Sequence, residues 1–138
     1  MAGSASDFLE LELLDHVLGN AAYTAPATTY IALATAAITD ADTGSTITEP
    51  IGNGYARVAF TNNATNWPVA AAGAKANGVA ITFATASGGN WGTVTHFAIL
   101  DALTLGNMLL WGDLTVSKVI NDGDTAEFAI GDLDVTLD

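Results

Sequence analysis

The stretch MLLWGDLTVSKVINDGDTAEFAIGDLDVTL, residues 108–137, carries the pattern that decides the fold. Short runs of apolar and β-branched residues are separated here by glycine, asparagine and aspartate, which is typical of strands joined by tight turns. The segment Asn121-Asp122-Gly123-Asp124 is a turn in which glycine can supply a positive φ. Apolar and polar residues alternate strictly in the last run, so one face of that strand is expected to be buried. The runs predict strands at Met108–Val116, Thr125–Ile130 and Leu133–Leu137.

The same pattern extends upstream and predicts further strands at Thr28–Thr35, Gly54–Phe60, Gly78–Phe83 and Val94–Asp101. Parallel pairing would need crossover helices between these strands, and the sequence has no pattern for them. We therefore expect a mainly β fold, an antiparallel β-sandwich of the jelly-roll or immunoglobulin-like kind. Because 138 residues suit one core, residues 1–138 are predicted to form a single domain, with a helical segment at 1–20 and the sandwich at 21–138.

One amphipathic helix is predicted near the N-terminus, over residues 7–20. Ser4 or Ser6 can cap its first amides, and Gly19 can take the left-handed conformation that ends a helix. Apolar side chains recur on one helical face, and Leu9 and Leu13 widen that face beyond what a lone surface helix needs. Two interpretations stay open: the face covers one end of the sheet core, or it contacts a partner. The face consists of Phe8, Leu11, Leu14, Val17 and Leu18.

The charge of the chain restricts the partners that it can have. Asp and Glu number 15 against 3 Lys and Arg, which gives a formal net charge of -12. Such a surface repels phosphates and anionic lipids, so neither a nucleic acid nor a membrane is expected as a partner. Residues 1–7 lack a basic region, and acidic residues interrupt the apolar stretch 8–18. We therefore expect neither a signal peptide nor a membrane span.

No metal or cofactor is predicted. The chain has no cysteine, which excludes disulfides and thiolate metal sites. Asp40-Ala41-Asp42 and Asp122-Gly123-Asp124 each place carboxylates two residues apart, but neither continues into a calcium-binding loop that ends in glutamate. Asn, Asp and Gly are ordinary turn formers, so turns are the favoured interpretation.

The sequence does not show the residues of a known type of catalytic site in a recognisable pattern. A nucleophilic triad would need His16 or His96, the two histidines of the chain. His16 suits the C-terminal end of the predicted helix, and His96 is expected to be a satisfied histidine within a strand. A glycosidase stays open as an alternative, because 15 acids provide many accidental pairs. No serine lies in a Gly-x-Ser-x-Gly elbow; the candidates are Ser4, Ser6, Ser45, Ser87 and Ser117.

Two long polar segments, 40–53 and 61–77, are expected to be loops that reach neighbouring subunits. Most aromatic residues lie in or beside predicted strands, where core packing is their expected role. Trp67 precedes Pro68 within the second loop, so it is predicted to be an interface anchor. The interface residues predicted from the sequence are therefore Phe8, Leu11, Leu14 and Trp67.

Taken together, these motifs resemble a small family of tailed-bacteriophage virion structural proteins, whose members are often labelled phage tail fibre proteins. The resemblance covers nearly the whole chain, and it rests on glycine turns and aromatic strand residues, which are structural rather than chemical features. The segments that carry it are the helix at 7–20, then 22–28, 52–58, 90–97, 106–112 and 123–138.

The resemblance implies a non-enzymatic virion protein. A fibre would show a shaft repeat and a receptor-binding tip, and this chain shows neither. We therefore expect a capsid decoration or cement protein on the capsid exterior, assembled as a homotrimer, that bridges subunits of the major capsid protein. The alternative is a tail or tail-fibre component that binds a host surface glycan, which a groove lined by exposed Trp or Tyr would favour.

Overall fold

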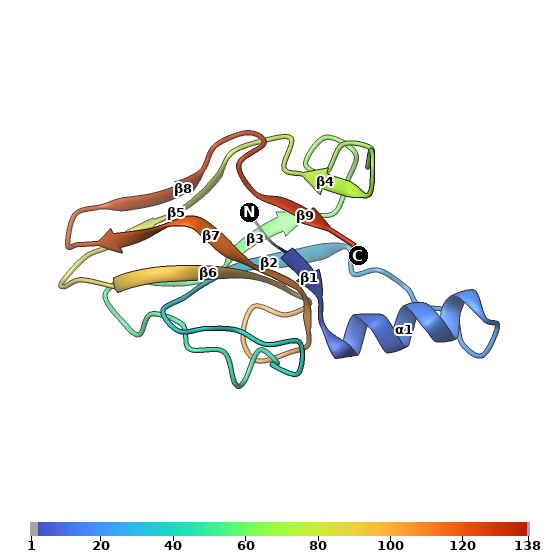
Figure 1. Ribbon diagram of the computed structural model, residues 1–138. Helices are drawn as coiled ribbons and strands as arrows, with labels where there is room; N and C mark the ends of the chain where they lie inside the picture. Colours follow the sequence, from blue (N-terminus) through green and yellow to red (C-terminus); the bar gives the residue numbers. More distant parts are fainter. Residues whose placement is uncertain (1–2, 138) are drawn as a thin grey trace.

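The computed structural model describes residues 3–137 and is mainly β, with antiparallel strands and one helix (Figure 1). The predicted antiparallel β-sandwich with an N-terminal helix is confirmed. The elements are β1 (Gly3–Ala5), α1 (Asp7–Val17), β2 (Thr28–Ala34), β3 (Val58–Thr61), β4 (Ala74–Ala76), β5 (Ile81–Thr85), β6 (Gly92–Leu100), β7 (Met108–Ile120), β8 (Thr125–Phe128) and β9 (Asp134–Thr136).

One layer of the sandwich is a 5-stranded sheet in the order β1-β7-β6-β2-β3. Its centre is the long hairpin of β6 and β7, in which Phe97 pairs with Gly112 and Ile99 with Leu110. The second layer consists of two separate pairs, β5 with β8 and β4 with β9. In Figure 1 these pairs lie along the upper side of the large sheet.

The main core fills the space between the two layers. Alternation along β2 turns Ile31 and Leu33 to this side and the intervening alanines to the other. Aromatic side chains supply much of the packing, including an edge-to-face contact of Phe97 with Phe128 at 6.1 Å between ring centroids. The two faces of β2 therefore pack into two different cores.

The other face of the large sheet is covered by chain without regular structure. Ala32, Ala34 and Ala98 are small enough to let the segment between β2 and β3 pack closely, and Ile38 is buried against them. In Figure 1 this segment runs beneath the sheet. Loop 40–53 is therefore a cover of the sheet rather than a free arm.

Arg57 holds the segment between β2 and β3 in place through an ion pair and hydrogen bonds. Its guanidinium is buried, with a side-chain exposure of 4%, and lies 2.7 Å from Glu49. The remaining N–H groups donate to the carbonyl oxygens of Gly44, Ala102 and Leu105. The Tyr55 hydroxyl also donates to Glu49, at 2.7 Å, and burial, followed by the nearby Glu49 charge, raises the pKa of Tyr55. One arginine thus joins two loops to the edge of β3.

The helix begins after Ser6, whose hydroxyl accepts from the Leu9 amide at 3.2 Å, and the predicted cap is confirmed for that serine. Gly19 has a φ of 83°, as expected for a residue that follows a helix end. The helix is shorter than predicted and ends at Val17. Within residues 3–137, no helix is long and apolar enough to cross a membrane.

Two strands were not predicted, β1 and β4. Each has three residues without a β-branched or aromatic side chain, and each exists because a distant strand pairs with it: β7 for β1 and β9 for β4. The alternation in the last strand predicted that Leu133, Val135 and Leu137 share a buried face. This is wrong for Leu137, which is exposed, whereas Leu133 and Val135 are buried.

Candidate functional site

A row of large apolar side chains on α1 faces solvent. Leu9 is buried, and Phe8 and Leu13 are half-buried beside Leu109, so the base of the helix packs against the sheet. The outer side of the helix projects from the strands, as Figure 1 shows. This outer side is called the helix face and consists of Leu11, Leu14, Val17 and Leu18, with exposed fractions of 64%, 57%, 74% and 79%.

The structure separates the helix residues that the sequence grouped together. Leu11 and Leu14 lie on the helix face, where a partner can reach them, whereas Phe8 contributes to the contact with the sheet. The interpretation that the whole apolar face covers the core is therefore wrong for Leu11 and Leu14. Leu9 and Leu13 take that role instead.

Trp67 does not lie on the surface. Its exposed fraction is 7%, and its ring meets Phe60 edge-to-face at 5.1 Å between centroids. The preceding Asn63 forms a turn in which its side chain accepts the amides of Thr65 and Asn66, and this turn directs Trp67 into the core. The premise that Trp67 is an exposed anchor is therefore wrong.

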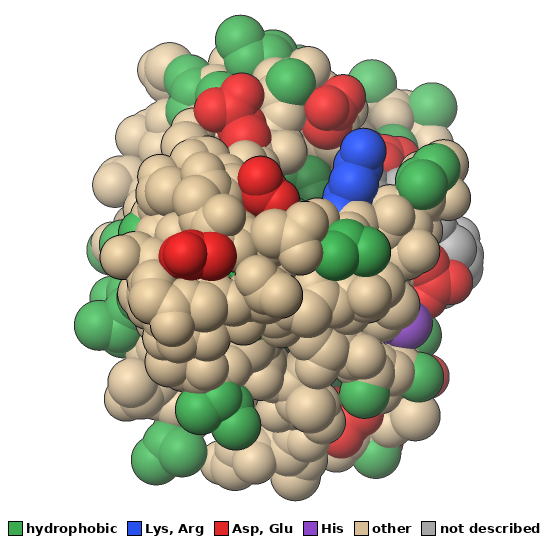
Figure 2. All heavy atoms as spheres, turned by 90° about the vertical axis from the view of Figure 1, so that its left-hand side faces the viewer, with side chains coloured by type: hydrophobic (Ala, Val, Ile, Leu, Met, Phe, Trp, Pro, Cys, Tyr) green, Lys and Arg blue, Asp and Glu red, His purple; other side chains and the backbone are tan. Residues whose placement is uncertain are grey.

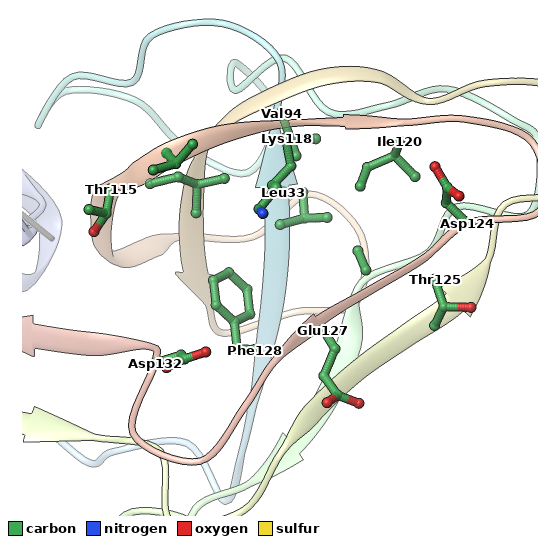
Figure 3. A pocket seen from close by; sticks show the side chains of 13 residues that line it. Leu33, Val94, Thr115, Lys118, Ile120, Asp124, Thr125, Glu127, Phe128 and Asp132 are labelled. Carbon is green, nitrogen blue, oxygen red and sulfur yellow. The ribbon is translucent and has the colours of Figure 1, made fainter.

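A groove of about 660 Å³ opens between β7 and β8. Leu33 and Val94 lie at its floor, and the main core continues there. From β7, residues 114–116, 118 and 120 line one wall, and Lys118 extends from that wall into the groove (Figure 3). Phe128 lies on the β8 side (Figure 3). The sandwich is thus open along this side.

The rim of the groove is mainly acidic. Asp124 lies at the turn end, Asp132 at the opposite end, and Glu127 on β8 between them (Figure 3). Figure 2 shows the end of the molecule where these strands turn, with one cationic side chain among several acidic ones beside a hollow. Residues 3–137 contain no carboxylate within salt-bridge distance of Lys118. The groove therefore combines an apolar floor with net negative charge.

Each histidine has polar partners close to it. His96 Nε2 lies 2.8 Å from Asp113 Oδ1, and its Nδ1 lies 2.7 Å from the hydroxyl of the adjacent Thr95. Asp113 is exposed, and these groups lie outside the groove. His16 Nδ1 accepts the Tyr23 amide just beyond the helix. Both rings have local partners that account for their positions, as expected for structural histidines.

Three of the four paired aspartates, Asp42, Asp122 and Asp124, stabilise turns, whereas Asp40 accepts the indole N–H of Trp111. Asp42 accepts the Thr39 amide at 2.8 Å, and this backbone hydrogen bond is the main reason why the pKa of Asp42 is lowered. Asp122 accepts the Gly88 amide, and Asp124 accepts the Asn121 amide. In the described part of the chain, no group of three His, Asp or Glu residues could hold a metal ion.

The glycosidase alternative would be favoured by two buried acids with raised pKa values, about 5 to 10 Å apart in a cleft. Among residues 3–137 no Asp or Glu is fully buried, and Glu49, with 19% of its side chain exposed, is engaged by Arg57. The walls of this groove carry no Trp or Tyr. A smaller pocket of about 170 Å³ beside α1 is lined by Tyr23 and the buried Trp67.

Comparison with known families identifies the kind of protein. The family described as Podophage GP4 fiber I protein gp80 matches residues 4–136. The chain belongs to this family. A search of curated proteins found no match. The resemblance to phage fibre proteins is confirmed, and this member of the fibre I family is a structural protein of the phage virion.

Proposed function

We propose that this fibre I family member is a non-enzymatic assembly component of the phage fibre, and that the helix face attaches it to a neighbouring virion protein. The observation that carries the proposal is the row of exposed apolar side chains at 11, 14, 17 and 18 on a helix that projects from the sheet. Contiguous exposed apolar surface of this kind marks interaction sites. Burying one leucine contributes about 1.5–3 kcal/mol, so a few such side chains supply a useful part of an interface.

A second candidate is the capsid decoration protein expected from the sequence, which would bridge subunits of the major capsid protein as a homotrimer. The net charge of -12, which suits an outer surface, favours it. The family description names a fibre and therefore favours the first candidate. Both candidates are mechanical roles without catalysis.

The copy number per particle distinguishes these candidates. Quantitative mass spectrometry of purified virions would compare this protein with the major capsid protein. For a fibre component we expect a few copies to a few tens, because a tail offers few symmetric positions. A ratio near one to one with the capsid protein would contradict the fibre assignment and support decoration.

Replacing Leu11 and Leu14 by aspartate tests the helix face. Both side chains are exposed, so we expect the free energy of unfolding to change by no more than about 1 kcal/mol. Incorporation into particles is expected to fall at least about tenfold, because two charges would have to be buried in the interface. Complementation with the variant, followed by immunoblotting of purified virions, measures incorporation.

The matched control is the pair Leu103→Asp and Ile130→Asp. Both residues are apolar and exposed, at 52% and 69%, but they lie outside α1 and outside loops 40–53 and 61–77. This pair adds the same charge and is expected to leave incorporation unchanged. Equal loss in both double variants would mean that added charge, rather than the helix face, is responsible.

A further inference from the structure

We infer that the groove between β7 and β8 is a docking site for an extended, cationic segment of another protein, which adds a strand to the free edge of β8. This inference is independent of the helix face, because the groove and α1 are separate surfaces. It concerns a second partner contact of the same domain.

Within residues 3–137, two strand edges beside the groove have no strand partner. In residues 3–137 β8 pairs only with β5, and Figure 3 shows the groove on its other side. On β7, pairing with β1 ends at Gly112, so its outer edge from Thr115 to Val119 has no strand partner in this part of the chain. Free backbone N–H and C=O groups beside an apolar groove are what an added strand uses.

The wall of the groove that β7 forms contains an irregularity in strand pairing. Between the pairs Val94–Lys118 and His96–Asp113 the register shifts, so that residues 114–117 lie opposite Thr95 alone. Such bulges bend a strand and are common beside binding sites. The bend accompanies the separation of β7 from β8, although a single turn, residues 121–124, connects the two strands.

The lining of the groove determines which side chains meet the occupant. Leu114, Val116 and Ile120 are the apolar residues that line the groove from β7, beside Thr115 and Lys118. Phe128 lies on the opposite side, and an extended segment can place apolar side chains against both walls, because successive side chains of a strand point to opposite sides. The groove lacks the Trp or Tyr on which a sugar ring would stack, so a peptide fits the lining better than a glycan.

The charge around the groove favours a cationic occupant. Asp124, Glu127 and Asp132 outnumber Lys118 around the groove, and the whole chain carries -12. A second copy of this chain would bring more negative charge, whereas a basic segment is attracted. Lys118 is exposed on a flexible stem and can turn to solvent. On a free edge, lysine also opposes unspecific strand pairing.

The test uses the whole protein and a short blocked peptide in which valine and lysine alternate. Titration followed by NMR is expected to shift the amides of residues 114–120 and 125–128. The same peptide with alternate amides N-methylated keeps its charge but loses backbone donors, and it is expected to bind at least about tenfold more weakly. A peptide with glutamate in place of lysine is expected not to bind.

Charge reversal locates the contact. Glu127→Lys with Asp132→Lys is expected to weaken binding of the valine-lysine peptide about tenfold. The control, Glu10→Lys with Asp15→Lys, makes the same change in net charge on α1 and should leave binding unchanged. Equal weakening in both, equal binding of the N-methylated peptide, or no shifts up to millimolar peptide would overturn the inference. Groove shifts that arise only from self-association or from an oligosaccharide would also overturn it.

Discussion

Replacing Arg57 by alanine is expected to lower the free energy of unfolding by about 3–5 kcal/mol, the usual effect of removing one partner of a buried ion pair. The loss is large because the guanidinium uses all of its N–H groups. Nε and Nη2 donate to Glu49, Nη2 also donates to Gly44, and Nη1 donates to two carbonyl oxygens of the β6–β7 connection. Alanine would leave these acceptors, which are buried or partly buried, without their donors. Urea unfolding of the purified protein measures the change.

Two further variants show whether the geometry or only the charge of Arg57 matters. Arg57→Lys keeps the charge but cannot reproduce the planar fork that reaches Glu49, Gly44 and both connection carbonyls. We therefore expect a clear loss that is smaller than that of alanine. A double-mutant cycle with Glu49→Ala is expected to give a coupling energy above about 0.5 kcal/mol. Unfolding of Arg57→Ala at the urea concentration of the parent protein would show that the network does not stabilise the fold.

The strands could be predicted where local chemistry is sufficient. The turn at 121–124, the strand composition of β2 and the alternation in β9 come from neighbouring residues, and these elements appear close to their predicted positions. β1 and β4 could not be predicted, because three-residue strands are created by distant pairing. Local sequence records turn chemistry, whereas short edge strands depend on contacts that form only in the folded chain.

The candidate surfaces were harder to predict than the strands. The helix has leucines on both sides, so its periodicity could not decide whether Leu9 or Leu11 faces the sheet. The groove is invisible in the sequence, since its lining comes from β2, β6, β7 and β8. The role of Arg57 left one signal: it is the single arginine of a chain with 3 cations. A scarce cation placed among apolar residues is a candidate for a buried ion pair.

For Trp67, burial in the core and a role as an interface anchor predict opposite effects of removing the side chain. An exposed anchor could be removed without loss of stability, and only assembly would suffer. A core residue cannot be removed without loss of stability, because its removal leaves a cavity against Phe60. We expect Trp67→Ala to lower the free energy of unfolding by about 3–5 kcal/mol, measured by urea unfolding followed by circular dichroism.

A graded series separates cavity formation from other causes. Trp67→Phe keeps a ring that can still meet Phe60 edge-to-face, so it is expected to lose clearly less stability than alanine. Leu11→Ala, which truncates an exposed apolar side chain, is the control and should change stability by no more than about 0.5 kcal/mol. A Trp67→Ala protein that is as stable as the parent but is not incorporated into virions would restore the interface role. The burial of the ring beneath the turn at Asn63 argues for the opposite result.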